Sequence, residues 1–263
     1  MSNKYAISLK TMQDIARVPR EVMGIPSEAK IPFSATVPQM RTALSLKYDQ
    51  GKQQQYDEFW DEYQTNGDRT DYQYAFAGAG WTDDTFKPKY PITPKGSMKN
   101  AFADSLIAEI PDNMLNTSGA TNFDYAFASM KNIKQITMVD CSNAKSLTYT
   151  FYASTALETL GIKVVESCTY TSPFTSCNAL VNLNVVGTIG NDIGFPKSTK
   201  LAIGSIIKII NALSSTATGK TLTLSKVAVD KAWETSEGAN DGSTTTGWLS
   251  LVGTKNNWTI SLA

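Results

Sequence analysis

The stretch FDYAFASMKNIKQITMV, Phe123 to Val139, places a Tyr-Ala-Phe triplet six residues before an apolar Ile-x-x-Ile-x-Met pattern. A phenylalanine followed five or six residues later by an apolar pattern of this kind occurs four times in the chain. The aligned phenylalanines are Phe102, Phe127, Phe151 and Phe174, at spacings of 25, 24 and 23 residues. The apolar residues that follow them are Ile107 and Ile110; Ile133, Ile136 and Met138; Leu157, Leu160 and Ile162; and Leu180, Leu183 and Val185. The stretch is therefore one copy of a repeated unit.

The period and the apolar positions predict the fold. A period of 20 to 29 residues with apolar residues at the first, fourth and sixth positions is typical of leucine-rich repeats, in which each copy contributes one short strand. Tyr74-Ala75-Phe76 copies the triplet 26 residues before Phe102 without a strand pattern after it, as a degenerate first copy would. We expect an α+β repeat fold, a short leucine-rich repeat solenoid of about four to five repeats, with Phe127 as a core residue.

The flanking segments predict a helical N-terminal cap and an α/β C-terminal cap. Residues 1–50 are punctuated by proline and suggest an arm or adaptor segment. Residues 51–71 contain an amphipathic helix, QQQYDEFWDEYQTNG, whose aromatic face would cover the end of the repeats at residues 72–190. Residues 191–263 predict a helix starting near Ser198 or Thr199, a strand TLTLS, a helix KVAVDKAW, a helix WLSLVGTK and a strand NWTISLA, with the two strands paired.

Composition excludes several kinds of chemistry. The chain has 24 basic and 24 acidic residues, so no overall field would attract it to nucleic acid or to an anionic membrane. It contains no histidine, which removes Ser-His-Asp triads and HExxH zinc sites. Cys141, Cys168 and Cys177 lack metal-ligand spacing and are expected to be small buried thiols. We predict no catalytic residue, no metal and no cofactor, and no segment long enough for membrane insertion.

Acidic residues on the N-terminal helix leave one enzymatic alternative open. Asp57, Glu58, Asp61 and Glu62 could act as paired carboxylates in glycoside hydrolysis. On a helix whose opposite face is aromatic, such residues are more often the solvent-facing side alone.

Two groups of residues are candidates for binding. Residues at the third and fifth positions of each strand pattern should point outward and form a stripe of amides and hydroxyls on the sheet. The stripe consists of Gln135, Thr137, Thr159, Asn182 and Asn184, with Glu109 from the first copy. Trp81, Phe86 and Tyr90, with Asp83 and Asp84 nearby, form a candidate aromatic loop that could bind a sugar or pack into the repeats.

The copy SPFTSCNALVNLNV resembles the BspA-type leucine-rich repeats, in which an Ala-Phe pair, often a cysteine three residues later, and a Leu-x-x-Ile strand alternate. The segment from Tyr56 to Tyr90, together with TGKTLTLS and NNWTISLA, resembles repeat proteins encoded in tail or surface modules of bacteriophages and prophages of gut bacteria. The family carries no catalytic residues and offers a binding surface.

The resemblance implies a non-enzymatic virion protein, associated with a phage tail, baseplate or fibre and made in the bacterial cytoplasm without a signal peptide. Its partner would be a host cell-surface glycan or protein, or another tail protein, and a homo-oligomer is compatible with such a role. A bacterial cell-surface adhesin and a glycan-degrading enzyme that uses Asp83 or Asp84 are the alternatives.

Overall fold

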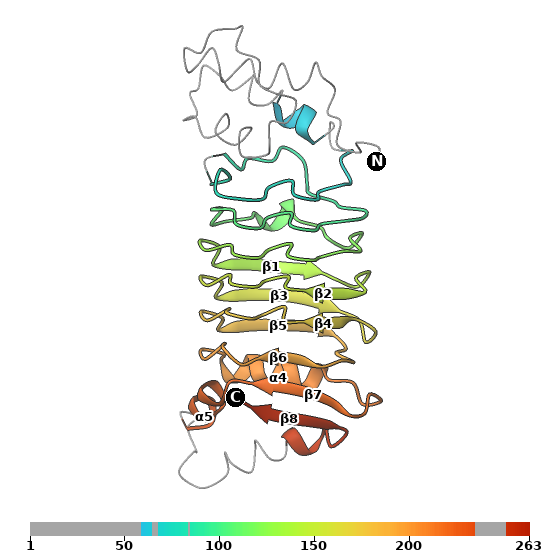
Figure 1. Cartoon of the computed structure of the whole chain (residues 1–263), viewed down its shortest axis with the longest axis vertical. Helices are drawn as coiled ribbons and strands as arrows, with labels where there is room; N and C mark the ends of the chain where they lie inside the picture. The colour runs from blue at the N-terminus through green and yellow to red at the C-terminus, as the bar shows by residue number, and fades with distance from the viewer. Residues whose placement is uncertain (1–58, 65–67, 84, 235–250) are drawn as a thin grey trace, which may run out of the picture.

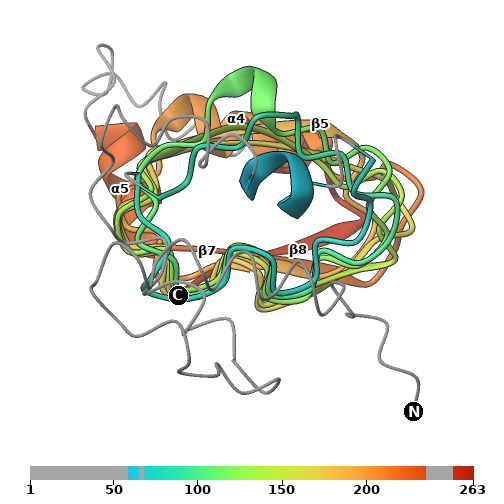
Figure 2. The same ribbon diagram turned by 90° about the horizontal axis from the view of Figure 1, so that it is seen from above.

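The structure is a computed structural model that describes residues 59–64, 68–83, 85–234 and 251–263. The chain winds in successive circuits of about two dozen residues that lie one above another (Figure 1). Seen from above, these circuits superimpose as a flattened ring (Figure 2). The predicted arm at residues 1–50 and the predicted helix stop at Asn66-Gly67 lie outside the described residues.

The described residues form eight strands, two α-helices and one short 3-10 helix, and residues 59–63 and 251–253 are also helical. In chain order the elements are η3 (Asp112–Met114), β1 (Gln135–Asp140), β2 (Ser146–Thr148), β3 (Thr159–Val164), β4 (Thr169–Thr171), β5 (Asn182–Gly187), β6 (Ile193–Phe195), α4 (Ile203–Ala212), β7 (Lys220–Leu224), α5 (Lys226–Glu234) and β8 (Trp258–Leu262).

These strands form three small parallel sheets, ordered β1-β3-β5, β2-β4 and β6-β7-β8. Pairing is parallel because equivalent segments of successive circuits run in the same direction, so that Gln135 pairs with Thr159 and Thr159 pairs with Asn182. Figure 2 shows β5 and α4 on one broad side of the ring and β7 and β8 on the other.

The predicted leucine-rich repeat solenoid with a helical N-terminal cap and an α/β C-terminal cap is wrong. The described residues form a mixed α/β structure with few helices and only small parallel sheets. Residues 107–110 form no strand, although the first copy of the pattern predicts one. β6, β7 and β8 form a separate sheet instead of extending β1-β3-β5. The apolar period therefore identified which residues stack but not the fold they form.

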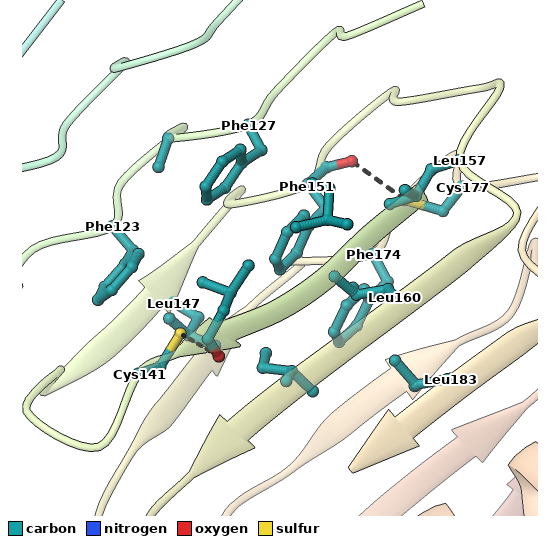
Figure 3. Close-up of a cluster of buried hydrophobic side chains, with 14 of the residues drawn as sticks. Phe123, Phe127, Cys141, Leu147, Phe151, Leu157, Leu160, Phe174, Cys177 and Leu183 are labelled. Atoms are coloured by element: carbon teal, nitrogen blue, oxygen red, sulfur yellow. Dashed lines mark hydrogen bonds between the residues drawn. The ribbon is translucent and has the colours of Figure 1, made fainter. Parts of the chain in front are cut away.

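A column of phenylalanine rings fills the interior, as Figure 3 shows for Phe127, Phe151 and Phe174. Phe127 is fully buried, with its ring centroid 5.2 Å from that of Phe102 and 5.5 Å from that of Phe151, each pair at 8° between ring planes. Phe151 and Phe174 continue the column at 5.6 Å. The prediction that Phe127 is a core residue is confirmed. Large parallel rings in contact bury apolar area and gain from offset stacking.

The backbone around each phenylalanine forms a ladder between circuits. The N–H of Phe102 donates to the carbonyl of Ala126 and the N–H of Phe127 donates to that of Thr150, both at 2.8 Å. Residues two positions before and after each phenylalanine have left-handed backbones, among them Tyr125 at φ 55°. This alternation aims successive N–H groups at the next circuit without forming a β-strand.

Different elements pack at the two ends of the described stack of circuits. At one end, helical residues 59–63 bury Trp60 and Tyr63 against the first circuit, and the Tyr63 hydroxyl donates to the carbonyl of Ala75. Near the other end, α4 packs beside β5, with the Ser205 hydroxyl donating to the carbonyl of Val181 at 2.9 Å. α4 thus occupies the position beyond β5 where another strand would extend the sheet.

Part of the predicted C-terminal order is confirmed. β7, α5 and β8 occur where a strand, a helix and a closing strand were predicted, and β7 pairs with β8. The predicted amino cap at Ser198 or Thr199 is wrong, because α4 begins at Ile203 with Ala202 as its N-cap residue. The buried Ser198 hydroxyl instead donates to the carbonyl of Cys177 at 3.2 Å.

Candidate binding surface

The outer face of the β1-β3-β5 sheet carries the first row of the predicted stripe. Gln135, Thr159 and Asn182 occupy register positions directly beside one another on neighbouring strands. Gln135 and Asn182 are exposed and Thr159 is half-buried, while the next residues, Ile136, Leu160 and Leu183, are buried. The Asn182 amide lies 3.4 Å from the Thr159 hydroxyl. Side chains alternate between the two faces of a strand, so these three form one continuous polar row.

The second row of the stripe is less regular. Asn184 pairs with Gly161 and is exposed, but the register between β1 and β3 shifts between Ile136 and Val139. A Cβ placed on Gly161 would come within 2.0 Å of the carbonyl oxygen of Thr137, so only glycine fits there. Thr137 is exposed and its hydroxyl donates to the carboxylate of Asp112 in η3. Thr137 is thus part of the surface but already has a partner within the chain.

Glu109 is exposed but stands apart from this sheet, because its segment is not a strand. The Asp83 carboxylate accepts the backbone N–H groups of Ala108 at 2.8 Å and of Glu109 at 3.2 Å. The Asp83 side chain therefore accepts the backbone hydrogen bonds that a neighbouring strand would accept in a sheet. Asp83, named above as a possible catalytic acid, has a structural use, and Asp84 lies outside the described residues.

The candidate aromatic loop is not a surface for sugar binding. Trp81 is only 2% exposed and Phe86 only 4%, and both rings pack against Phe76. Tyr90 is half-buried, and its hydroxyl donates to Asp61 at 2.8 Å. Trp81 and Phe86 are core residues, because the first circuit needs aromatic volume to meet the helical residues 59–63, and Tyr90 lies half-buried beside Asp61.

Asp61, on the acidic side of the N-terminal helix, contacts Lys89 and Tyr90 of the first circuit. Its second carboxylate oxygen lies 2.7 Å from Nζ of Lys89, and the hydrogen bonds from Lys89 and Tyr90 lower the pKa of Asp61. This carboxylate connects the helical residues to the first circuit. Asp57 and Glu58, the other half of the proposed carboxylate set, lie outside the described residues.

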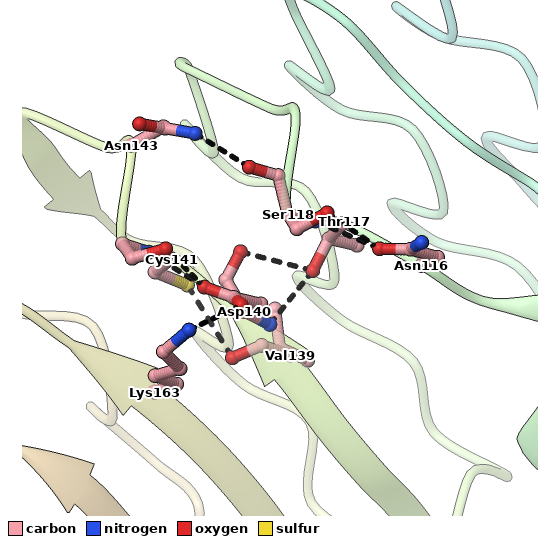
Figure 4. A network of polar contacts seen from close by, with 9 residues as sticks. Asn116, Thr117, Ser118, Val139, Asp140, Cys141, Asn143 and Lys163 are labelled. Carbon is pink, nitrogen blue, oxygen red and sulfur yellow. Dashed lines mark hydrogen bonds and ion pairs between the residues drawn. The ribbon is translucent and has the colours of Figure 1, made fainter.

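A network of polar contacts lies at the C-terminal end of β1 (Figure 4). The buried Thr117 hydroxyl donates to the carbonyl of Asp140 at 3.0 Å and accepts its N–H at 2.7 Å. The Asp140 carboxylate accepts from the Ser142 hydroxyl at 2.5 Å and pairs with Nζ of Lys163 at 2.9 Å. Burial raises the pKa of Asp140, but the hydrogen bonds from Ser142 and the Lys163 ammonium outweigh it, so the net pKa is lowered. The network holds three circuits in register and keeps the carboxylate charged.

The three cysteines are buried and free, as predicted. Burial raises the pKa of Cys177 to about 12 and that of Cys168 to about 11. Burial and the neighbouring Cys168 raise the pKa of Cys141 as well. Because the thiolate is the nucleophile, none of these thiols is activated for catalysis at neutral pH.

Sequence analysis missed an aromatic group on the surface. Tyr125 is 36% exposed and Tyr152 is 38% exposed, and the ring of Tyr149 lies between them, 5.1 Å from Tyr125 and 5.5 Å from Tyr152 between centroids. The sequence feature that points to this group is the tyrosine two residues before the phenylalanine in two adjacent copies, Tyr125 and Tyr149. That position was treated as part of the repeat pattern and not as a surface.

Within the described ranges, no group of three or more Cys, Asp or Glu residues is placed to hold a metal ion. No helix in the part of the chain that the structure describes is long and apolar enough to cross a membrane. Comparisons of the chain with protein-family models, with curated proteins and with solved structures gave no match. The function therefore has to be argued from the residues and their geometry.

Proposed function

We propose that this chain is a non-enzymatic binding protein of a bacteriophage particle, which contacts a host cell-surface glycan or protein, or another tail protein, through the polar sheet face. The polar sheet face is defined by Gln135, Thr159, Asn182 and Asn184 on β1, β3 and β5. The observation that carries this proposal is the in-register row of Gln135, Thr159 and Asn182.

Such a row suits recognition because its spacing is fixed. Neighbouring strands lie about 4.8 Å apart, so the row repeats amide and hydroxyl groups at that interval across three strands. Buried Ile136, Leu160 and Leu183 hold the backbone beneath it. Neutral donors and acceptors on a rigid support can bind a polar partner with little loss of conformational entropy.

The non-enzymatic part of the proposal rests on composition and on the uses found for the acidic residues. The chain has no histidine, so it lacks the side chain that most often transfers protons near neutral pH. Asp61, Asp83 and Asp140 are each engaged in contacts that hold the structure together.

The particle setting rests on the resemblance of the flanking segments to phage-encoded proteins. It is tested by mass spectrometry of purified particles of the source phage. Peptides of this chain at a level comparable to known tail proteins support the setting. Their absence from intact particles contradicts it, whatever the polar sheet face binds.

The binding part is tested by pull-down of the purified chain with cell walls of the host. We expect the double variant Gln135→Ala with Asn182→Ala to lose most retention, because it removes both ends of the in-register row. A matched control is Ser215→Ala with Thr218→Ala, which removes two exposed hydroxyl groups away from this sheet. Equal retention of both variants would show that the polar sheet face is not the binding surface.

A further inference from the structure

Three tyrosines form a compact aromatic surface, here called the tyrosine platform and defined by Tyr125, Tyr149 and Tyr152. The rings of Tyr125 and Tyr149 are stacked at 21° between ring planes, and Tyr152 meets Tyr149 edge-on at 89°. Tyr125 and Tyr152 expose more than a third of their surface. Large aromatic residues left exposed in contact with one another indicate a binding surface more strongly than scattered ones do.

The backbone holds this platform rigidly. Tyr125 and Tyr149 have left-handed backbones, at φ 55° and φ 51°, which bulky residues rarely adopt. Each is held there by the ladder between circuits, in which the N–H of Tyr125 donates to the carbonyl of Thr148 and the N–H of Tyr149 donates to that of Thr171. The left-handed backbone recurs at this position in the neighbouring circuits as well, so the same ladder that stacks the circuits also fixes the points from which these two rings project.

Hydroxyl groups surround the rings. β2 leads directly into Tyr149 and β4 into Ser172, and their register places Ser146 beside Thr169 and Thr148 beside Thr171. Thr169, Thr171 and the following Ser172 are exposed. At the position equivalent to Tyr125 and Tyr149, the circuits on either side have the shorter polar residues Asn100 and Ser172. Neutral hydrogen-bonding residues therefore border the rings, with one half-buried acidic residue, Asp124, directly before Tyr125.

We propose that the tyrosine platform, with the hydroxyls of Thr171 and Ser172 beside it, is a binding site for a neutral polysaccharide. The apolar C–H face of a sugar ring stacks on an aromatic face, while its hydroxyls need neutral donors and acceptors around that ring. The platform supplies both, and its side chains carry no charge that would select a charged ligand. This site is separate from the polar sheet face and does not depend on the particle setting.

The chemistry favours a sugar over a protein surface. Protein interfaces have a buried apolar core, in which aromatic residues are joined by other apolar groups. Here the exposed residues that border the tyrosines are Thr169, Thr171 and Ser172, and no large aliphatic side chain is exposed at residues 122–130, 146–153 or 169–177. A site of this composition is hydrated and polar except at the ring faces, which matches a saccharide.

The test titrates the purified full-length chain with neutral hexasaccharides of β-1,4-linked glucose, α-1,4-linked glucose and β-1,4-linked N-acetylglucosamine, followed by calorimetry. We expect at least one to bind, with Tyr125→Ala and Tyr152→Ala each weakening the affinity by about 2- to 12-fold, the range for loss of one aromatic stacking contact. Tyr152→Phe keeps the ring and should keep most of the affinity.

Two controls separate this site from others. Tyr74→Ala removes a tyrosine that is 44% exposed and also stands two residues before a phenylalanine, with φ 56°, but makes no ring contact with the platform. This variant should bind the hexasaccharides normally. The double variant Ser215→Ala with Thr218→Ala, which removes two exposed hydroxyl groups outside both the platform and the polar sheet face, should also bind these hexasaccharides normally. Loss of binding in either control would place the sugar elsewhere.

A measurement on the unchanged chain covers the case in which a tyrosine variant does not fold. Ring resonances of the platform tyrosines should shift on addition of the bound hexasaccharide, while those of Tyr74 should not. The proposal is overturned if no hexasaccharide binds at millimolar concentration, if the platform resonances do not respond, or if the platform instead binds a protein partner that the sugars do not displace.

Discussion

Phe127 is the residue whose removal tests the interior most directly. Its ring is fully buried between those of Phe102 and Phe151, so an alanine there leaves a cavity that its neighbours cannot fill without breaking their own stacking. We expect Phe127→Ala to lower the free energy of unfolding by about 3–5 kcal/mol, measured by urea denaturation.

Tyr74→Ala is the control for that measurement. It removes an aromatic ring of similar size that is 44% exposed, and changes at such a surface position are usually within about 0.5 kcal/mol. Similar losses in the two variants would mean that the phenylalanine column is not what stabilises the circuits.

Burial of the Cys177 thiol predicts that the stability of the folded chain depends on pH. Its pKa rises from 9.0 to about 12 on folding because the thiol is buried. The folded chain therefore keeps a proton that the unfolded chain releases, so the thiol's contribution to stability is complete below pH 9 and is lost as pH rises toward 12. We expect the urea midpoint to fall between pH 9 and pH 11 more steeply in the unchanged chain than in Cys177→Ser.

Cys177→Ser is a conservative change here because the chain already uses serine at the equivalent position. The Cys177 thiol points at the carbonyl of Phe151 at 3.0 Å, and one circuit earlier the Ser154 hydroxyl donates to the carbonyl of Phe127 at 2.6 Å. The variant should therefore fold at pH 7. An identical alkaline fall in both proteins would rule out a contribution from this thiol.

At the scale of elements, two glycines predict opposite effects of the same substitution. A Cβ on Gly161 in β3 would meet the carbonyl oxygen of Thr137 at 2.0 Å, whereas a Cβ on Gly204 in α4 would meet nothing within 4 Å. Gly161→Ala should destabilise the chain by about 1–3 kcal/mol through overpacking. Gly204→Ala should stabilise it by about 0.4–1 kcal/mol, because alanine loses less backbone entropy in a helix.

Thermal unfolding of the two variants, followed by circular dichroism, checks both signs. The pair matters because Gly161 lies where β1 and β3 lose their regular register, between the two rows of the polar sheet face. If Gly161→Ala were neutral, β1 would have room to move away from β3, and the second row would not be held rigidly.

Strand positions were predicted correctly where the neighbouring circuits contain equivalent strands. Ile133 and Leu157 precede strands that pair with one another, so their apolar period and their structure agree. Ile107 and Ile110 have the same period but no equivalent strand beside them, and Asp83 takes that place through hydrogen bonds to the backbone. A local pattern cannot report whether its pairing partner exists.

The helix α4 shows that a local pattern can predict an element and still miss the residue at which it begins. A helix was predicted there correctly, and its isoleucines Ile206, Ile209 and Ile210 are buried. Its start could not be read from Ser198, because that hydroxyl is used by the carbonyl of Cys177 on a neighbouring circuit. Capping preferences are local, whereas the competing acceptor is 21 residues away.

At the scale of the whole molecule, the circuits present two different surfaces. The outward positions of Gln135, Thr159 and Asn182 could be predicted, since alternation along a strand and a constant period determine them. The tyrosine platform had only a partial signal, the tyrosines at one repeat position in adjacent copies, and its geometry could not be predicted because tyrosine seldom adopts the left-handed backbone that Tyr125 and Tyr149 have. The burial of Trp81 was one of the two alternatives drawn from the sequence, and the partner it packs against, the helical residues 59–63, was found only in the structure.

The stacking of circuits also predicts how stability is distributed along the molecule. β3 has a paired strand on both sides. The first described circuit, residues 68–83 and 85–92, has backbone hydrogen bonds to the circuit after it, and on its other side it is held by side-chain hydrogen bonds such as those of Gln64 to the backbone of Lys89 and Tyr90. We expect native-state hydrogen exchange to be slowest in β3, at a free energy close to that of global unfolding, and faster by at least tenfold in residues 68–92. Phe127→Ala should then speed exchange in β3 as well as at its own circuit, because the phenylalanine column connects them. Uniform protection from residue 68 to residue 187 would instead mean that the circuits open only together.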